Sequence, residues 1–213
     1  MKITVYSTKG SAGKTPIATN IALDREYAIW TNEPYHIFDE FIPDDRLLSL
    51  DLNDSFPTIP DEVDIVFDLA GSISKSALSI TSAIKQSDVV LVPIYNEVKS
   101  IKAGLNTIAE VMNFNKNIVV IATKLQKKKK TDVFKSWTDS DDFLNIQNAV
   151  HSQIGKSIPV MPLKYSAVFD AIFEQEHSIE QLINNSGLAK YQYREVWDQF
   201  KAIYKLIDSK YAK

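Results

Sequence analysis

The sequence predicts an α/β protein with a mostly parallel sheet that is flanked by helices on both faces. Short apolar runs rich in β-branched residues alternate with segments of helix length. These runs are continuously apolar, which is typical of strands buried on both faces of a sheet. A turn with two glycines connects the first run to the first helical segment. The length of 213 residues fits one domain over residues 1–213.

The expected elements follow the chain in regular alternation. Strands are predicted at residues 3–6, 27–31, 65–67, 89–92, 118–122 and 158–161. Helices are predicted at residues 14–24, 76–85, 99–113, 138–154, 168–176 and 190–211. The last helix is amphipathic and carries one apolar stripe, formed by Tyr193, Trp197, Phe200, Tyr204, Ile207 and Tyr211. We expect the stripe to dock on the chain's own sheet, although a partner helix or a membrane surface would also accept it.

Composition excludes several classes of protein. The chain has no Cys, so disulfides, thiolate metal sites and Cys nucleophiles are excluded, and a cytoplasmic location is expected. No apolar stretch is long enough to span a membrane. The net charge is −3, but residues 39–64 are strongly acidic and residues 124–135 are strongly basic. Each cluster is either a solvated loop or a local binding surface.

Residues 7–16 read STKGSAGKTP and carry the clearest chemical signal. A turn from a strand into a helix points backbone N–H groups and the positive end of the helix dipole at one place, which suits a phosphate. Gly10 and Gly13 allow the backbone to approach such a ligand closely. Lys14 can reach the β- and γ-phosphates, and the Thr15 hydroxyl can ligate Mg²⁺. Pro16 is tolerated in a first helical turn.

The same segment departs from the standard phosphate-loop pattern, because Thr8 stands where that pattern has glycine. A second lysine, Lys9, precedes the first glycine. In this it resembles the K-G-G-x-G-K-[ST] motif of the ParA/MinD family of deviant Walker A ATPases, with Ser11 in place of the second glycine. The small plasmid-partition (ParF-like) type is the most similar. The resemblance implies the P-loop NTPase fold.

Later segments extend the resemblance to about residue 182. The family's D-x-D-P motif corresponds to residues 31–34, where Thr31 replaces the first acid and Glu33 replaces the second. In the family, the second acid positions the attacking water. Residues 64–72 resemble its Walker B strand and switch, with Asp68 in the Mg²⁺ shell and Gly71 near the γ-phosphate. Two later turns match the family's base contacts, at Thr123 and Lys124 and at Pro162 and Leu163.

The resemblance therefore implies a set of site residues. Lys9, Lys14 and Glu33 would act in catalysis, and Thr15 and Asp68 would hold Mg²⁺. Nucleotide contacts are expected at Lys9, Gly10, Ser11, Ala12, Gly13, Lys14, Thr15, Pro16, Thr123, Lys124, Pro162 and Leu163. ATP is expected rather than GTP, because the guanine-binding N-K-x-D pattern is absent around Lys124.

The function implied is an ATPase that forms a homodimer on binding ATP, with Lys9 reaching the partner's phosphates. The dimer would bind DNA without sequence preference, associate with the nucleoid and position a plasmid or other cargo. A small DNA-binding protein of ParB- or ParG-like type would stimulate hydrolysis. The candidates for DNA contact are Lys127, Lys128, Lys129 and Lys130, and secondly Arg194, Lys201 and Lys205 in the last helix.

Three other functions fit parts of the sequence. A MinD-like membrane-associated positioning ATPase would use the last helix, although a membrane partner is not expected. A slow or non-hydrolysing nucleotide switch is favoured by Thr31 and by the extra methylene of Glu33. A ligase or amidase on the same scaffold, such as dethiobiotin synthetase, would need its own acid–base residues, and no such group stands out.

Overall fold

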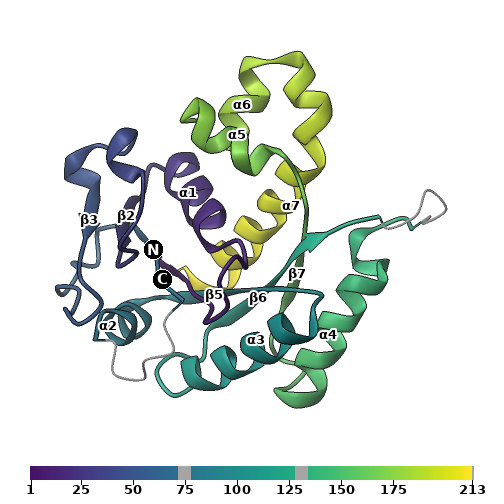
Figure 1. Cartoon of the computed structure of the whole chain (residues 1–213), viewed down its shortest axis with the longest axis horizontal. Helices are drawn as coiled ribbons and strands as arrows, with labels where there is room; N and C mark the ends of the chain where they lie inside the picture. The colour runs from purple at the N-terminus through teal and green to yellow at the C-terminus, as the bar shows by residue number, and fades with distance from the viewer. Residues whose placement is uncertain (72–77, 128–133, 213) are drawn as a thin grey trace.

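The computed structural model describes residues 1–71, 78–127 and 134–212. In this part of the chain, seven parallel strands form one sheet in the order β3-β2-β4-β1-β5-β6-β7 (Figure 1). The strands are β1 (Lys2–Val5), β2 (Ala28–Thr31), β3 (Leu47–Ser49), β4 (Ile65–Asp68), β5 (Val89–Tyr95), β6 (Ile118–Leu125) and β7 (Val160–Lys164). The predicted α/β fold with a parallel sheet is confirmed.

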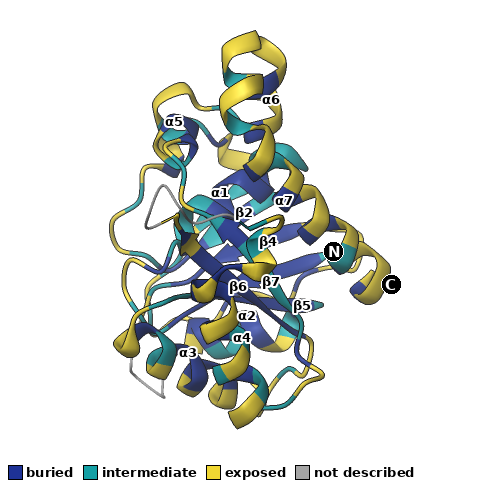
Figure 2. Cartoon of the chain, turned by 90° about the vertical axis from the view of Figure 1, so that its right-hand side faces the viewer, coloured by how far each residue is buried: buried dark blue, intermediate teal, exposed yellow. Residues whose placement is uncertain are grey.

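Helices cover both faces of the sheet. They are α1 (Lys14–Asp24), α2 (Leu78–Gln86), α3 (Val98–Val111), α4 (Asp141–Gln153), α5 (Val168–Gln175), α6 (Ile179–Asn185) and α7 (Gly187–Tyr211). One apolar core lies under α1, α5, α6 and α7, and a second lies under α2, α3 and α4. Figure 2 shows the buried strands between these two layers. The continuously apolar strands follow from this arrangement, because each strand faces a core on both sides.

The apolar stripe of α7 packs within its own chain, as expected. Its last four side chains, from Phe200 to Tyr211, are buried, and Tyr193 and Trp197 pack against the same core. The helix lies against β7 and α6. In the described part of the chain, no helix is long and apolar enough to cross a membrane.

Several boundaries differ from the predicted ones for local reasons. The predicted helix 138–154 is divided at Ser140, whose hydroxyl accepts a hydrogen bond from the Phe143 N–H and so begins α4 there. The short strand β3 at the sheet edge was not predicted. Helix α6 was also missed, although Ser178 and Gln181 form a capping box at its start. Residues 76 and 77 of another predicted helix lie outside the described residues.

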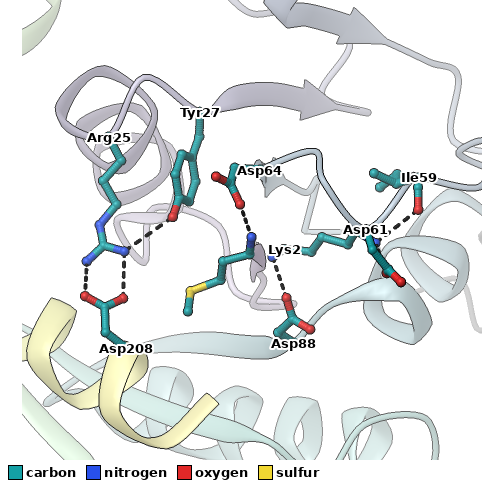
Figure 3. A network of polar contacts seen from close by, with 9 residues as sticks. Lys2, Arg25, Tyr27, Ile59, Asp61, Asp64, Asp88 and Asp208 are labelled. Carbon is teal, nitrogen blue, oxygen red and sulfur yellow. Dashed lines mark hydrogen bonds and ion pairs between the residues drawn. The ribbon is translucent and has the colours of Figure 1, made fainter. Parts of the chain in front are cut away.

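Ion pairs and hydrogen bonds link the start of the chain, the segments before β4 and β5, and the ends of α1 and α7 (Figure 3). The amino group of Met1 pairs with Asp64, and the Lys2 N–H donates to the Asp88 carboxylate at 2.7 Å. At the end of α1, Arg25 forms two hydrogen bonds with Asp208 of α7, at 2.8 and 2.7 Å. Asp64 precedes β4 and Asp88 precedes β5, so the contacts of Met1 and Lys2 join β1 to its two neighbours at the amino end of the sheet. The phosphate loop lies at the opposite end, because it follows the carboxyl end of β1.

Candidate functional site

The predicted site residues meet at the carboxyl edge of the sheet. The phosphate loop follows β1, which lies between β4 and β5 in the sheet. Glu33 follows β2, Gly71 follows β4, and Lys124 lies near the end of β6. One open cleft of about 520 Å³ is lined by residues 10–16 of the phosphate loop together with Glu33, Gly71 and Lys124. In open α/β sheets, ligands bind at this edge.

The phosphate loop is shaped by two residues with left-handed backbone. Gly13 has φ 93° and Ser11 has φ 59°. Gly13 is also the N-cap of α1 and has no side chain to cap the helix, so the first N–H groups of the helix are available to an anion. Thr123 supports the loop from β6, because its hydroxyl donates to the Ala12 carbonyl at 3.0 Å.

Lys14 lies at the base of this cleft. Its ammonium is 3.7 Å from a carboxylate oxygen of Glu33, and the Lys14 side chain is 7% exposed. Gly71 packs directly on the loop, since a Cβ there would lie 3.2 Å from the Ser7 carbonyl and 3.5 Å from Lys14 Nζ. The structure thus brings together the lysine, the acid and the glycine that the sequence separates by up to 57 residues, Lys14 to Gly71.

Asp68 is fully buried at the end of β4. Neither of its carboxylate oxygens has a hydrogen-bond partner of normal geometry among the described residues. Burial raises the pKa of Asp68 to about 7, against the opposing effects of the Thr15 hydroxyl and the Lys14 ammonium nearby. A fully buried carboxylate beside a threonine hydroxyl and a phosphate loop fits the oxygen ligands and water shell that Mg²⁺ takes. No cluster of three or more acidic, His or Cys side chains offers another metal site in the described part.

Lys9, in the phosphate loop, lies beside Tyr95. Burial and the neighbouring Glu97 raise the pKa of the Tyr95 hydroxyl, while the Lys9 ammonium lowers it. The Lys124 ammonium lies 4.8 Å from the centre of the Tyr95 ring. Tyr95 therefore stands between two of the predicted nucleotide-binding lysines, a position that no sequence motif marked.

A narrower cavity of about 130 Å³ adjoins the phosphate loop. Its apolar walls include Pro16, Ile17, Leu163 and Phe169, and polar groups come from both β6 and α5. The full lining is Gly13, Pro16, Ile17, Thr123, Lys124, Leu163, Tyr165, Ser166, Phe169 and Asp170. Its apolar walls suit a nucleobase, and its lining shares Gly13, Pro16 and Lys124 with the open cleft, so a base here could be attached to a phosphate chain there.

The turn that was expected at Pro162 and Leu163 lies further along the chain. Strand β7 continues to Lys164, so Pro162 lies within the strand opposite Ala122 and does not line the cavity. The turn begins at Tyr165, and Tyr165, Ser166, Phe169 and Asp170 were missed for this reason. An apolar run that ends at Leu163 gives no sign of whether the strand stops before or after Pro162.

The basic candidates for DNA contact are only partly within the described residues. Lys127 is exposed, with its ammonium 5.0 Å from the centre of the Phe134 ring. Lys128, Lys129 and Lys130 lie outside the described residues. In α7, Arg194 and Lys201 both pair with Asp198, at 3.8 and 2.6 Å, which reduces the net charge of that face.

Comparison with known proteins gives the fold. No protein-family model and no curated protein matches the sequence. Among solved structures, McdA of Cyanothece superposes with a TM-score of 0.61 at 11% identity over 96% of this chain and 98% of that one. A variant of McdA in complex with ATP gives the same TM-score at 13% identity, over 96% of this chain and 95% of that one.

Two further structures superpose over nearly the whole chain. MinD of Aquifex aeolicus has a TM-score of 0.55 at 14% identity, over 95% of this chain and 96% of that one. A plasmid partition protein of Borrelia burgdorferi bound to AMPPNP has a TM-score of 0.51 at 14% identity, over 94% and 98%. The chain thus has the fold of the ParA/MinD deviant Walker A ATPases, and the expected resemblance is confirmed at that level.

Proposed function

We propose that this protein is an ATPase of the ParA/MinD type that dimerises on binding ATP and Mg²⁺, binds DNA without sequence preference and positions a cargo such as a plasmid. The observation that carries the proposal is the fully buried Asp68 carboxylate, which lies next to Lys14 and the phosphate loop and makes no hydrogen bond of normal geometry with the described residues. A buried carboxylate whose charge is only partly offset by its neighbours is costly to the fold, and a bound cation would offset that cost.

The side chains divide the chemistry between them. Lys14 and the N–H groups of α1 hold the β- and γ-phosphates, and Glu33 accepts a hydrogen bond from the attacking water and so orients it. Mg²⁺, when bound, supplies charge neutralisation on the phosphate oxygens, with Thr15 and Asp68 holding its shell. Glu33 is near enough to act at that place, because its carboxylate lies 3.7 Å from Lys14 Nζ.

The choice of ATP rests on both chemistry and similarity. The cavity beside Thr123 has no asparagine and aspartate placed as in the guanine-binding motif, since Gln126 stands at the acidic position. McdA and the Borrelia protein superpose on this chain from complexes with ATP and AMPPNP respectively. We therefore expect calorimetry with Mg²⁺ to give tighter binding of ATP than of GTP, and equal or tighter binding of GTP would contradict this.

DNA is favoured over a membrane as the binding surface. A membrane-binding helix needs a free apolar face, but the stripe of α7 is used in the core of this chain. A basic loop presented twice in a dimer would hold phosphates without reading bases. The partner that triggers hydrolysis would be a small DNA-binding protein of ParB- or ParG-like type. A slow switch is the second candidate, because Thr31 occupies the place of the family's first acid.

Three variants test the ATPase cycle by gel filtration and phosphate release. Lys14→Ala should lose nucleotide binding, because the phosphates lose their main cation. Lys9→Ala should bind ATP as a monomer but fail to dimerise. Glu33→Ala should form a long-lived dimer that does not turn over. If Lys9→Ala dimerises and hydrolyses ATP normally, the proposed mechanism is wrong.

DNA binding is tested separately with the four lysines from Lys127 to Lys130 replaced by Ala. Duplex binding should require ATP and weaken with salt, with a log–log slope of roughly −0.9 for each phosphate neutralised. The quadruple variant should have a shallower slope and weaker affinity for every sequence. Unchanged affinity would exclude this loop and direct attention to Arg194, Lys201 and Lys205.

A further inference from the structure

The two residues that precede Glu33 connect three segments of the site. Asn32 is 3% exposed, and both ends of its amide are used. Its Nδ2 donates to the Ser79 hydroxyl at 2.7 Å, and its Oδ1 accepts from the Ala70 N–H at 2.7 Å. The Ser79 hydroxyl donates in turn to the Leu52 carbonyl at 2.8 Å. One side chain after β2 thus binds both the loop after β4 and the beginning of α2.

Thr31 makes a second connection beside the first. Its hydroxyl donates to the Asp68 carbonyl at 2.9 Å and accepts from the Glu33 N–H at 3.0 Å. Thr31 is fully buried. The backbone of the proposed water-orienting acid is therefore tied through one hydroxyl to the backbone of the proposed metal-shell acid.

The segment held by Asn32 lies directly on the phosphate loop. Ala70 is followed by Gly71, whose Cα packs so closely on the Ser7 and Thr8 carbonyls and on Lys14 Nζ that a Cβ there would lie within 3.5 Å of all three. Because it binds Ala70 and precedes Glu33, Asn32 sets the distance between the loop after β4 and Glu33. A buried amide costs free energy unless its donor and its acceptor are both hydrogen-bonded, so an apolar side chain would be sufficient if this position only filled space. Both ends of the Asn32 amide are bonded, and its role here is to hold these segments together.

We propose that Asn32, supported by Thr31, is a positioning residue for ATP hydrolysis that keeps Glu33 in register with the loop after β4. The inference rests on the proposed function and deepens it. Asn32 touches no phosphate and exchanges no proton. It acts through Glu33 and Gly71, so its loss misplaces the water relative to the phosphate and leaves the phosphate contacts of Lys14 in place.

The test compares turnover with nucleotide affinity in matched variants of the full chain. Asn32→Ala should lower kcat by about 10- to 100-fold, the rate equivalent of losing a buried pair of hydrogen bonds. Its Kd for ATP with Mg²⁺, measured by calorimetry, should stay near the wild-type value. Asn32→Asp keeps the acceptor for Ala70 and loses the donor to Ser79, so its kcat should be intermediate. Asn106→Ala on the exposed face of α3 is the control and should match the wild type.

A second pair of variants serves if Asn32→Ala does not fold. Thr31→Val keeps the shape of the side chain without the hydroxyl, whereas Thr31→Ser keeps the hydroxyl without the methyl group. Thr31→Val should lower kcat while the affinity for ATP is maintained, and Thr31→Ser should retain most of the wild-type kcat. Equal turnover by the valine and serine variants would overturn the inference.

The remaining outcomes separate this inference from the function it rests on. A wild-type protein that neither binds nor hydrolyses ATP would refute the proposed function, and the inference with it. A wild-type ATPase whose Asn32→Ala variant turns over at the same rate would refute the inference alone. A variant that loses ATP affinity in proportion to kcat would show general damage to the site, which also refutes a positioning role.

Discussion

Replacement of Asp68 by asparagine should stabilise the fold while weakening its response to magnesium. The carboxylate is fully buried and unpartnered among the described residues, and its pKa is raised by burial from 3.8 to about 7. A shift of this size makes the ionised form unfavourable by about 4 kcal/mol, at ~1.4 kcal/mol for each pKa unit. Because the folded pKa is raised, the wild type loses stability as pH rises from about 4 to about 7, and Asp68→Asn lacks that loss.

The amide of the variant is itself buried with few partners, so part of the gain is offset. We expect Asp68→Asn to raise the free energy of unfolding at pH 8 by about 1–3 kcal/mol. For a chain of this size this corresponds to a rise in Tm of roughly 3–10 °C. Asp44→Asn, at the exposed first residue of a short 3₁₀ helix, is the matched control and should leave Tm unchanged.

Thermal unfolding at pH 8 measures both parts of the prediction. Without nucleotide, the variant should melt above the wild type. With ATP, added Mg²⁺ should raise the Tm of the wild type further than that of the variant, because only the wild type has the carboxylate. A variant that is no more stable than the wild type, or that gains as much from Mg²⁺, would refute the role assigned to this buried acid.

Three further substitutions test other features of the structure. Ser11→Gly should raise Tm slightly, since Ser11 has φ 59° and a non-glycine residue there costs about 1 kcal/mol; a lower Tm would contradict this backbone. Gly104→Ala should destabilise the fold by about 1–3 kcal/mol in urea unfolding, because a Cβ on α3 would lie 2.3 Å from the Ile94 side chain; unchanged stability would mean that Ile94 repacks freely. Burial raises the pKa of Asp24 to about 6, while hydrogen bonds from Ser178 and Tyr204 lower it, so the wild type should lose stability between about pH 4 and pH 6 and Asp24→Asn should lose less. Urea titrations at both pH values measure the difference. An equally steep fall in the variant would exclude Asp24 as its source.

Pattern alone predicted most of the strands and the helix that follows the phosphate loop. Helix α1 begins and ends at the predicted residues, 14 and 24, because a glycine turn precedes it and apolar side chains recur at helical spacing. The chemistry of the phosphate loop is also local, since its glycines and lysines are adjacent in the chain. The roles assigned to these residues in catalysis and DNA binding stay predictions.

Short elements without strong periodicity could not be predicted in this way. Strand β3 has three residues and exists because its backbone pairs with β2, from Ile29 opposite Leu47 to Thr31 opposite Ser49. Three residues carry too little alternation to mark a strand. The end of β7 was likewise decided by pairing with β6, which carries the strand past Pro162 and moves the cavity wall to Tyr165.

The amino-acid sequence by itself determined the class of fold, the order of its main elements and the phosphate loop, because hydrophobic period and turn chemistry are properties of neighbouring residues. Only the tertiary structure decided that the Asp68 carboxylate is fully buried and makes no hydrogen bond of normal geometry with the described residues, and that Asn32 binds Ala70 and Ser79. Those residues are 38 and 47 positions from Asn32 in the chain. Hydrogen-bond partners at such separations are chosen by the packing of parallel strands, which brings the ends of β2 and β4 together.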